Sequence, residues 1–363
     1  MKVLLIRLRS IGDIIQCTPA FAATRELLKN ASIDLMIDER FAELVIENPS
    51  IDGFLLYNNG GRGFFERLKY DLNFLKIIRK RRYDMVIDFH GIPKTAWFSY
   101  LSGAKIRLGY NYAGRGHLYN RRAEPPQKFK VHSARNQINL LKVLPNDLKG
   151  AGDFLDDYKL RTYIGARHSE AELDAFLSGN LDAAGSPESS MIITYHITPS
   201  NNFKKWHSSN YAALINMCER HPALSKFNVN HVIIGRAEDE IEFDKIEAAV
   251  KTVKGRLISA CGKLSLGAVY NLAKKSSCFV GPDSGPLHIA AAAGILTIGL
   301  FGPTNIETFA PPSENFRGVY NPELTCRPCD QKRCRNGFKC LKTIKASEVF
   351  YTMLKNIIEL NLN

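Results

Sequence analysis

The sequence of 363 residues is long enough for two domains of ordinary size, each with its own hydrophobic core. Hydrophobic residues make up 45% of the chain and aromatic residues 10%, which excludes extended disorder. No apolar run approaches the ~20 residues that span a bilayer, and the first residues lack the apolar stretch and cleavage site of a signal peptide. We therefore expect a protein that stays in the cytoplasm.

The net charge of +13 is concentrated in the first half of the chain. Residues 1–165 hold 27 Lys and Arg against 17 Asp and Glu, whereas residues 166–363 hold 22 against 19. Such a surplus attracts nucleic acid, an anionic membrane surface or an anionic substrate. Nucleic acid is disfavoured because no known nucleic-acid-binding motif accompanies the charge. A solvated basic surface is the plain alternative, above all for residues 79–82.

In the first half, short β-rich runs alternate with helical stretches, which implies a parallel sheet with helices on both faces. Strands are predicted at Val3–Arg7, Ile33–Ile37, Phe54–Tyr57, Met85–Phe89 and Ile106–Gly109. Helices are predicted at Pro19–Lys29, Phe65–Arg81 and 166–180. This set predicts a first domain over residues 1–180.

A linker is predicted over 181–190, after which the same pattern begins again in a second domain over 191–346. Strands are predicted at Met191–His196, His231–Gly235, Cys278–Gly281 and Leu296–Phe301, and helices at 208–220, 238–250 and 265–275. Two such domains in tandem suggest a ligand cleft at the carboxyl ends of their strands. The segment 347–363 contains an amphipathic helix that we expect to pack back on the first domain.

Residues 278–302 combine a strand, a tight polar turn, a helix of small residues and a second strand. Pro286 opens the helix, where its missing N–H costs nothing. The amides and the positive helix dipole at this end favour an anion such as phosphate, with His288 beside it. The alternative is an ordinary crossover in which Asp283 or Ser284 only caps the helix.

The first strand leads into Ser10-Ile11-Gly12-Asp13, where a glycine permits a tight turn and a carboxylate projects from it. A carboxylate at a cleft edge can act as a general base toward a hydroxyl group. The alternative assigns Asp13 to helix capping.

Several short motifs define a more specific pattern when they are taken together and in order. They are Ser10-Ile11-Gly12-Asp13, Asp88-Phe89-His90-Gly91 followed by Lys94, Lys205-Trp206, Asp283-Ser284-Gly285-Pro286-Leu287-His288 and Phe301-Gly302-Pro303-Thr304. By these motifs the chain, up to about residue 345, resembles glycosyltransferase family 9, the heptosyltransferases of lipopolysaccharide core assembly.

The resemblance implies an α/β protein of the GT-B fold, with two Rossmann-like domains whose parallel sheets face a central cleft. The N-terminal domain would bind the acceptor and the C-terminal domain the nucleotide sugar, usually ADP-L-glycero-D-manno-heptose. The family is inverting and independent of metal ions. By position, Asp13 would be the catalytic base, while Lys205 and the 283–288 turn would neutralise the departing diphosphate.

The resemblance and the local sequence add further candidates around the two substrates. For the nucleotide sugar they are Ser200, Asn201, Glu238, Leu264, Asp283, Ser284, Gly285 and His288. Glu238 follows a strand-ending glycine by three residues, as expected of a ribose-binding carboxylate, and Asp239 is the alternative. The acceptor candidates are Lys94, Arg62 and Arg107, with Arg115 as an additional one. The basic first half suits an anionic, lipid-linked saccharide at the inner membrane surface.

Four of the eight cysteines cluster as Cys326, Cys329, Cys334 and Cys340. Because disulfides are disfavoured in a reducing cytoplasm, this spacing favours a structural Zn²⁺ or Fe ion, and free thiols on a basic loop are the alternative. The simplest family members lack the cluster, and some protein-modifying relatives carry cysteine-rich metal fingers. The acceptor is therefore either a lipopolysaccharide core or a protein side chain.

The leading hypothesis is an inverting glycosyltransferase that moves a heptose from ADP-heptose to an acidic lipopolysaccharide-core acceptor. It requires no cofactor for catalysis and no nucleic-acid partner. A second hypothesis keeps the fold but changes the acceptor or the nucleotide sugar. A third, of another class, is a nucleotide-binding scaffold whose basic face lies on a membrane.

Overall fold

The computed structural model describes residues 1–58, 60–61, 63–126, 130–149, 152–181 and 190–361. The chain divides into two compact units, Met1–Gly165 and Ala166–Asn363. Each unit is an α/β body built on one parallel sheet of six strands. Within the described residues, no helix is both long enough and apolar enough to cross a membrane.

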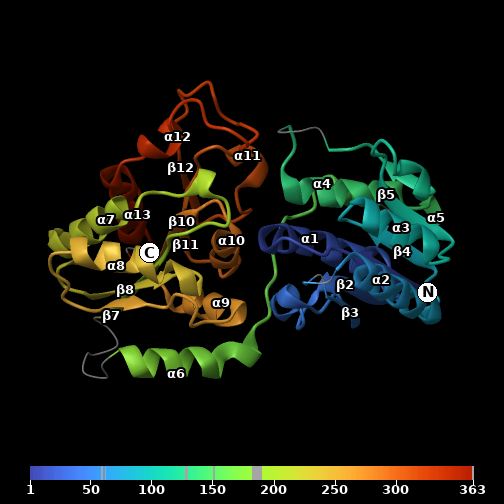
Figure 1. Ribbon diagram of the computed structural model, residues 1–363, viewed down its shortest axis with the longest axis horizontal. Helices are drawn as coiled ribbons and strands as arrows, with labels where there is room; N and C mark the ends of the chain where they lie inside the picture. The colour runs from blue at the N-terminus through green and yellow to red at the C-terminus, as the bar shows by residue number, and fades with distance from the viewer. Residues whose placement is uncertain (59, 62, 127–129, 150–151, 182–189, 362–363) are drawn as a thin grey trace. The chain divides into compact units, whose positions relative to one another are not determined.

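In the first unit the strands are ordered β3-β2-β1-β4-β5-β6 and all neighbouring pairs are parallel. The strands are β1 (Lys2–Ile6), β2 (Ser32–Asp38), β3 (Gly53–Tyr57), β4 (Met85–Asp88), β5 (Ile106–Tyr110) and β6 (Arg121–Ala123). The helices are α1 (Ile11–Leu27), α2 (Phe64–Arg81), α3 (Pro93–Leu101), α4 (Ser133–Leu140) and α5 (Asn146–Lys149) (Figure 1). The five predicted strands are therefore confirmed, and β6 was missed.

The second unit repeats this topology with the order β12-β11-β10-β7-β8-β9, again with parallel neighbours. Its strands are β7 (Ser190–His196), β8 (Asn228–Ile234), β9 (Leu257–Ser259), β10 (Cys278–Pro282), β11 (Leu296–Leu300) and β12 (Phe316–Val319). Its helices are α6 (Glu170–Asn180), α7 (Ser208–Arg220), α8 (Glu240–Ala249), α9 (Leu266–Lys275), α10 (Gly285–Ala292), α11 (Ile306–Phe309), α12 (Lys339–Lys342) and α13 (Ala346–Asn361).

Helix α1 begins eight residues before the predicted start and contains Pro19 in its interior. Proline lacks the N–H that would bond the carbonyl four residues earlier, here that of Ile15. The hydroxyl of Thr18 donates to this carbonyl at 2.7 Å and so replaces the missing bond. The prediction that Pro19 opens the helix was wrong because a side chain satisfies the backbone instead.

The domain limits differ from those predicted at two places. The boundary lies at residues 165 and 166, and α6 packs against α9 in the second unit, where Asn271 donates to the carbonyl of Ala166 at 2.7 Å. Helix α13 lies beside α7 in the second unit and buries Phe350 and Met353 in that unit's core, although we expected it on the first domain (Figure 1). Apolar periodicity identified the helix but not the surface that it covers. Most of the predicted linker lies outside the described residues.

Candidate active site

Both sheets reverse their strand order next to their first strand, and in such sheets ligands bind outside the carboxyl ends at that point. In the first unit the reversal lies between β1 and β4, and in the second between β7 and β10. The loops that follow these four strands carry most of the predicted site residues. Each unit therefore presents its own set of polar side chains at one edge of its sheet.

Asp13 lies in the first turn of α1, directly after β1. Its carboxylate accepts hydrogen bonds from the backbone N–H of Ser10 at 3.2 Å and from the Ser10 hydroxyl at 3.0 Å. The guanidinium of Arg7 lies 2.9 Å from the other carboxylate oxygen and also donates to the carbonyl of Phe89 at 2.7 Å. The Asp13 side chain remains 42% exposed. Asp13 thus caps the start of α1, as the alternative interpretation predicted. Its carboxylate is nevertheless accessible to solvent and is linked through Arg7 to the end of β4.

The turn after β4 is held by Asp88, which is fully buried. Its carboxylate accepts from the backbone of His90 and Gly91 at 2.9 Å each and from the hydroxyl of Tyr119 at 2.7 Å. Both ring nitrogens of His90 are shielded from solvent and have no hydrogen-bond partner among the described residues. Burial, followed by the charge of Arg7, lowers the pKa of His90 to about 4, so its ring is neutral at pH 7. His90 belongs to the motif Asp88-Phe89-His90-Gly91, but the sequence predicted no role for its side chain.

The predicted acceptor residues that the structure describes form ion pairs or hydrogen bonds with other residues of the first unit. The ammonium of Lys94 lies 3.0 Å from the carboxylate of Asp71 and donates to the hydroxyl of Tyr57 at 2.8 Å. Arg107 donates to backbone carbonyls at 2.8 and 3.1 Å, and Arg115 donates to the carbonyl of Gly91 at 2.7 Å. Among the acceptor candidates that the structure describes, Arg115 thereby contacts the turn after β4. Arg62 lies outside the described residues.

In the second unit, Asp283 follows β10 and is buried. The ammonium of Lys204 lies 2.7 Å from one of its carboxylate oxygens, and Nε2 of His288 lies 3.8 Å from the other. Burial raises the pKa of Asp283, but the hydrogen bond with His288 and the charge of Lys204 outweigh it and lower the pKa to about 2. An ionised carboxylate therefore fixes a lysine and a histidine at the start of α10.

Ser284 is the N-cap of α10, and Pro286 stands in the first turn as predicted. The Ser284 hydroxyl lies 3.0 Å from Nδ1 of His196, the last residue of β7. Burial lowers the pKa of His196 to about 4. The start of α10 is therefore linked to the neighbouring strand, with Gly285 half-buried at its first position.

Lys205 lies elsewhere than we expected. Its ammonium is 3.1 Å from the carboxylate of Glu242 on α8, and both residues line a cavity of about 440 Å³ between α7, α8 and α12. Lys204, the preceding residue, is the lysine at the 283–288 turn. Adjacent residues in an irregular loop point in different directions, and the sequence pattern did not distinguish the two.

The remaining nucleotide-sugar candidates surround the same sheet edge less closely. Asn201 donates to the side chain of Gln331 at 2.8 Å, and Ser200 is exposed beside it. Glu238 is exposed after β8 and lies 2.8 Å from Arg236, whereas the alternative Asp239 is buried and bonds the Arg236 backbone. Leu264 is half-buried before α9.

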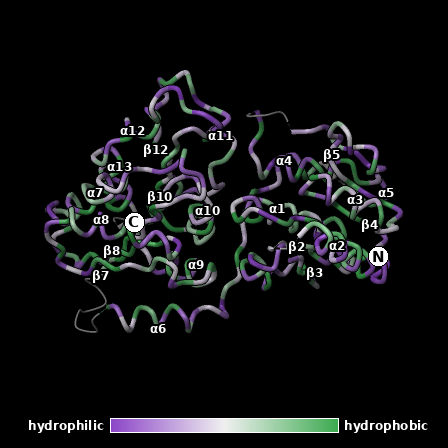
Figure 2. Tube along the Cα trace, viewed as in Figure 1, coloured by the Kyte–Doolittle hydropathy of each residue, from purple (hydrophilic) through white to green (hydrophobic). Residues whose placement is uncertain are grey.

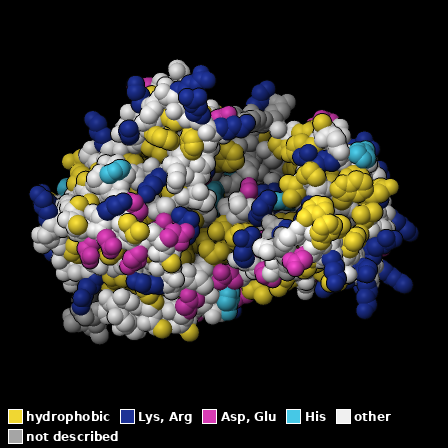
Figure 3. Space-filling model, viewed as in Figure 1, with side chains coloured by type: hydrophobic (Ala, Val, Ile, Leu, Met, Phe, Trp, Pro, Cys, Tyr) yellow, Lys and Arg dark blue, Asp and Glu magenta, His cyan; other side chains and the backbone are white. Residues whose placement is uncertain are grey.

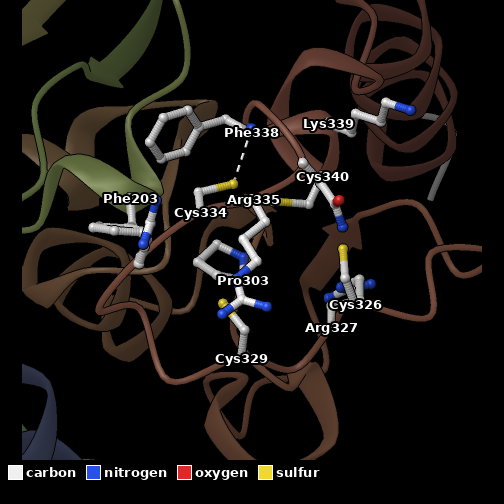
Figure 4. Close-up of a pocket in the computed structure, with 12 residues that line it drawn as sticks. Phe203, Pro303, Cys326, Arg327, Cys329, Cys334, Arg335, Phe338, Lys339 and Cys340 are labelled. Carbon is white, nitrogen blue, oxygen red and sulfur yellow. Dashed lines mark hydrogen bonds between the residues drawn. The ribbon is translucent and has the colours of Figure 1, made fainter.

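The four clustered cysteines, Cys326, Cys329, Cys334 and Cys340, line one cavity of about 290 Å³ in the second unit. Figure 4 shows them on different sides of this cavity, where the backbone N–H of Phe338 donates to the sulfur of Cys334 at 3.1 Å. Across the part of the chain that the structure describes, no three His, Cys, Asp or Glu side chains are grouped so as to hold a metal ion. The geometry therefore does not support the predicted structural metal site.

Two Rossmann-like units with polar residues at both strand-order reversals define a GT-B glycosyltransferase fold. The family model "Glycosyltransferase family 9 (heptosyltransferase)" matches residues 72–339, and the chain belongs to this family. It is therefore a glycosyltransferase of the heptosyltransferase family, as the motifs predicted.

Individual relatives agree with this assignment over nearly the whole chain. Lipopolysaccharide heptosyltransferase 3 of Escherichia coli (strain K12) is 25% identical and covers 94% of both chains. A family 9 glycosyl transferase from Veillonella parvula has a TM-score of 0.77 at 20% identity, covering 98% of this chain and 97% of that one. The E. coli ADP-heptose lps heptosyltransferase II has a TM-score of 0.75 at 19% identity and covers both chains completely.

Proposed function

We propose that the enzyme transfers a heptose from ADP-L-glycero-D-manno-heptose to an anionic inner-core lipopolysaccharide acceptor, with inversion at the anomeric carbon. The family membership and the donor named for heptosyltransferase II support this proposal. The observation that carries it is the Lys204–Asp283–His288 cluster at the start of α10, which suits a diphosphate.

On the donor side, the leaving group is ADP, and negative charge grows on its β-phosphate as the sugar departs. Lys204 supplies a fixed cation, and the amides at the start of α10 add the positive end of the helix dipole. Asp283 orients Lys204 and His288 through its two oxygens, so it acts as a positioning residue. These groups take the place of a metal cofactor in the proposed reaction. Lys204 therefore replaces Lys205 in the role that we first predicted.

On the acceptor side, Asp13 removes the proton from the attacking hydroxyl. That oxygen forms a bond to the anomeric carbon while the bond from this carbon to the phosphate oxygen breaks, which inverts the configuration. Arg7 and Ser10 hold the carboxylate in place through a charge-assisted contact and a hydrogen bond. The neutral His90 lies in the field of Arg7 and Asp13 and forms part of the surroundings of the base.

The Asp13→Asn variant tests the acceptor half of this mechanism. It keeps the shape of the side chain but loses the basic oxygen, so we expect the rate of ADP release to fall by about 10²–10⁴-fold while ADP affinity stays unchanged. Asp174→Asn, a change at another exposed carboxylate, is the matched control. Full turnover by Asp13→Asn would remove Asp13 as the base.

The identity of the acceptor is tested by product analysis. We expect mass spectrometry to show one added heptose on a core oligosaccharide that carries acidic sugars, and none on protein side chains. Transfer to a polypeptide instead would favour the protein-modifying alternative. Tight ADP binding with no transfer to either acceptor would favour the scaffold alternative.

A further inference from the structure

Helix α2 of the first unit carries a row of exposed apolar side chains that nothing in the described structure covers. Phe64, Leu68 and Leu72 are spaced by four residues and therefore lie on one face of the helix. Phe64 is 78% exposed and the adjacent Phe65 is 82% exposed, with their rings 5.5 Å apart. The buried residues Phe74 and Ile78 lie on another side of α2 than Leu68 and Leu72. An exposed apolar surface of this kind marks an interaction site.

The same row continues into positive charge. Lys76 and Lys80 follow Leu72 at intervals of four residues, and Arg79 lies beside them, all exposed to solvent. Along α2, Figure 2 shows hydrophilic and hydrophobic residues intermixed. The exposed side of the helix that carries Phe65 is therefore apolar in its first turns and cationic in its last turns.

Helix α3, which packs beside α2, extends the apolar surface with aromatic residues. Trp97, Tyr100 and Leu101 are exposed at the spacing that places them on one helix face. Trp97 and Tyr100 are in contact, with ring centroids 6.0 Å apart, and the guanidinium of Arg107 lies over the Tyr100 ring at 5.5 Å. In Figure 3, hydrophobic side chains gather over α2 and α3, with Lys and Arg side chains at their edge.

We propose that this α2–α3 face, defined by Phe64, Phe65, Leu68, Leu72, Trp97 and Tyr100, binds the surface of a bilayer that contains anionic phospholipids. Aromatic and apolar side chains enter the interface between headgroups and acyl chains, and neighbouring lysines and arginines contact the lipid phosphates. The charge complementarity is specific to this unit, since residues 1–165 hold most of the positive surplus. The biological purpose of this membrane binding rests on the proposed function, because a lipid-linked acceptor would lie in such a membrane surface.

The first test is flotation of the protein with vesicles of phosphatidylglycerol and phosphatidylethanolamine, compared with vesicles of phosphatidylcholine. We expect binding to the anionic vesicles that weakens as salt rises. The double variants Phe64→Ser/Phe65→Ser and Lys76→Glu/Lys80→Glu should each lower the affinity at least tenfold. The control variants Ile241→Ser and Lys355→Glu alter exposed residues of the same chemical types in the second unit and should bind as the wild type does.

The fluorescence of Trp97 reports whether the α2–α3 face touches the lipid. The chain has two tryptophans, and Trp206 is buried at 1% exposure whereas Trp97 is 50% exposed. Brominated lipids should therefore quench the fluorescence of Trp97, and the Trp97→Phe variant should lose this quenching while it still binds.

Wild-type protein that does not bind anionic vesicles, or α2 variants that bind as well as the wild type, would overturn the proposal. So would self-association that disappears in the Phe64→Ser/Phe65→Ser variant without any vesicle binding, since a second copy of the chain would then cover the face. The vesicles contain neither donor nor acceptor, so the outcome is independent of the transferase activity. Conversely, failure of transfer to a water-soluble acceptor would contradict the proposed function and leave the membrane surface intact.

Discussion

Asp283 is a buried carboxylate that stays ionised because Lys204 and His288 face its two oxygens. Its pKa is lowered to about 2 in the folded protein, below the ordinary value of 3.8. Its ionisation therefore stabilises the fold above pH 4, and this contribution is lost as the pH falls through the folded pKa. The difference corresponds to about 2 kcal/mol.

The Asp283→Asn variant isolates this contribution. We expect the wild type to lose about 2 kcal/mol more unfolding free energy between pH 5 and pH 2 than the variant does. Urea denaturation at a series of pH values measures the difference. Parallel curves for the two proteins would show that Asp283 does not have a lowered pKa.

At the level of single residues, the sequence predicted which loops carry the candidate site residues but not every contact that these residues make. Asp13 and the 283–288 turn were predicted because strand, glycine and proline signals place them at the carboxyl ends of strands. The choice between Lys204 and Lys205 was not predictable, since it depends on the backbone path of a loop without regular periodicity. Arg7 and His90 were missed because their roles arise from contacts across β1 and β4.

At the level of elements, helix α13 was predicted correctly as a helix, but the part of the protein on which it packs was predicted wrongly. Met353 is completely buried in the core of the second unit, among residues of β11 and α7. Its amphipathic pattern fixes which side is buried, whereas the partner is set by the strand order, which the pattern does not contain.

Met353→Ala tests this packing. We expect it to lower the free energy of unfolding by about 2–5 kcal/mol, because the truncation leaves a cavity in a close-packed core. Tyr351→Ala, on the exposed side of the same helix, should cost less than about 1 kcal/mol. Chemical denaturation compares them, and equal losses for the two variants would contradict the assigned packing.

For the whole molecule, the two units share one strand order although no repeat is evident in the sequence. Alternation of strands and helices predicted two parallel sheets, because each crossover must cover a sheet face. The edge strands β6, β9 and β12 were missed, since they are short and only partly apolar. The cysteine spacing suggested a metal site, yet the folded loop spreads the four thiols around a cavity wall.

The central claim is that the second unit holds the diphosphate of an ADP-linked sugar through Lys204 at the start of α10. Isothermal titration calorimetry with ADP, UDP and GDP, without divalent ions, tests it most directly on the wild type, Lys204→Ala and Lys205→Ala. We expect a preference for ADP, an affinity at least tenfold weaker in Lys204→Ala, and little change in Lys205→Ala. Thermal unfolding of each variant provides the folding control, because Asp283 loses an ion-pair partner in Lys204→Ala. Preference for UDP or GDP, or a loss of affinity confined to Lys205→Ala, would contradict the account.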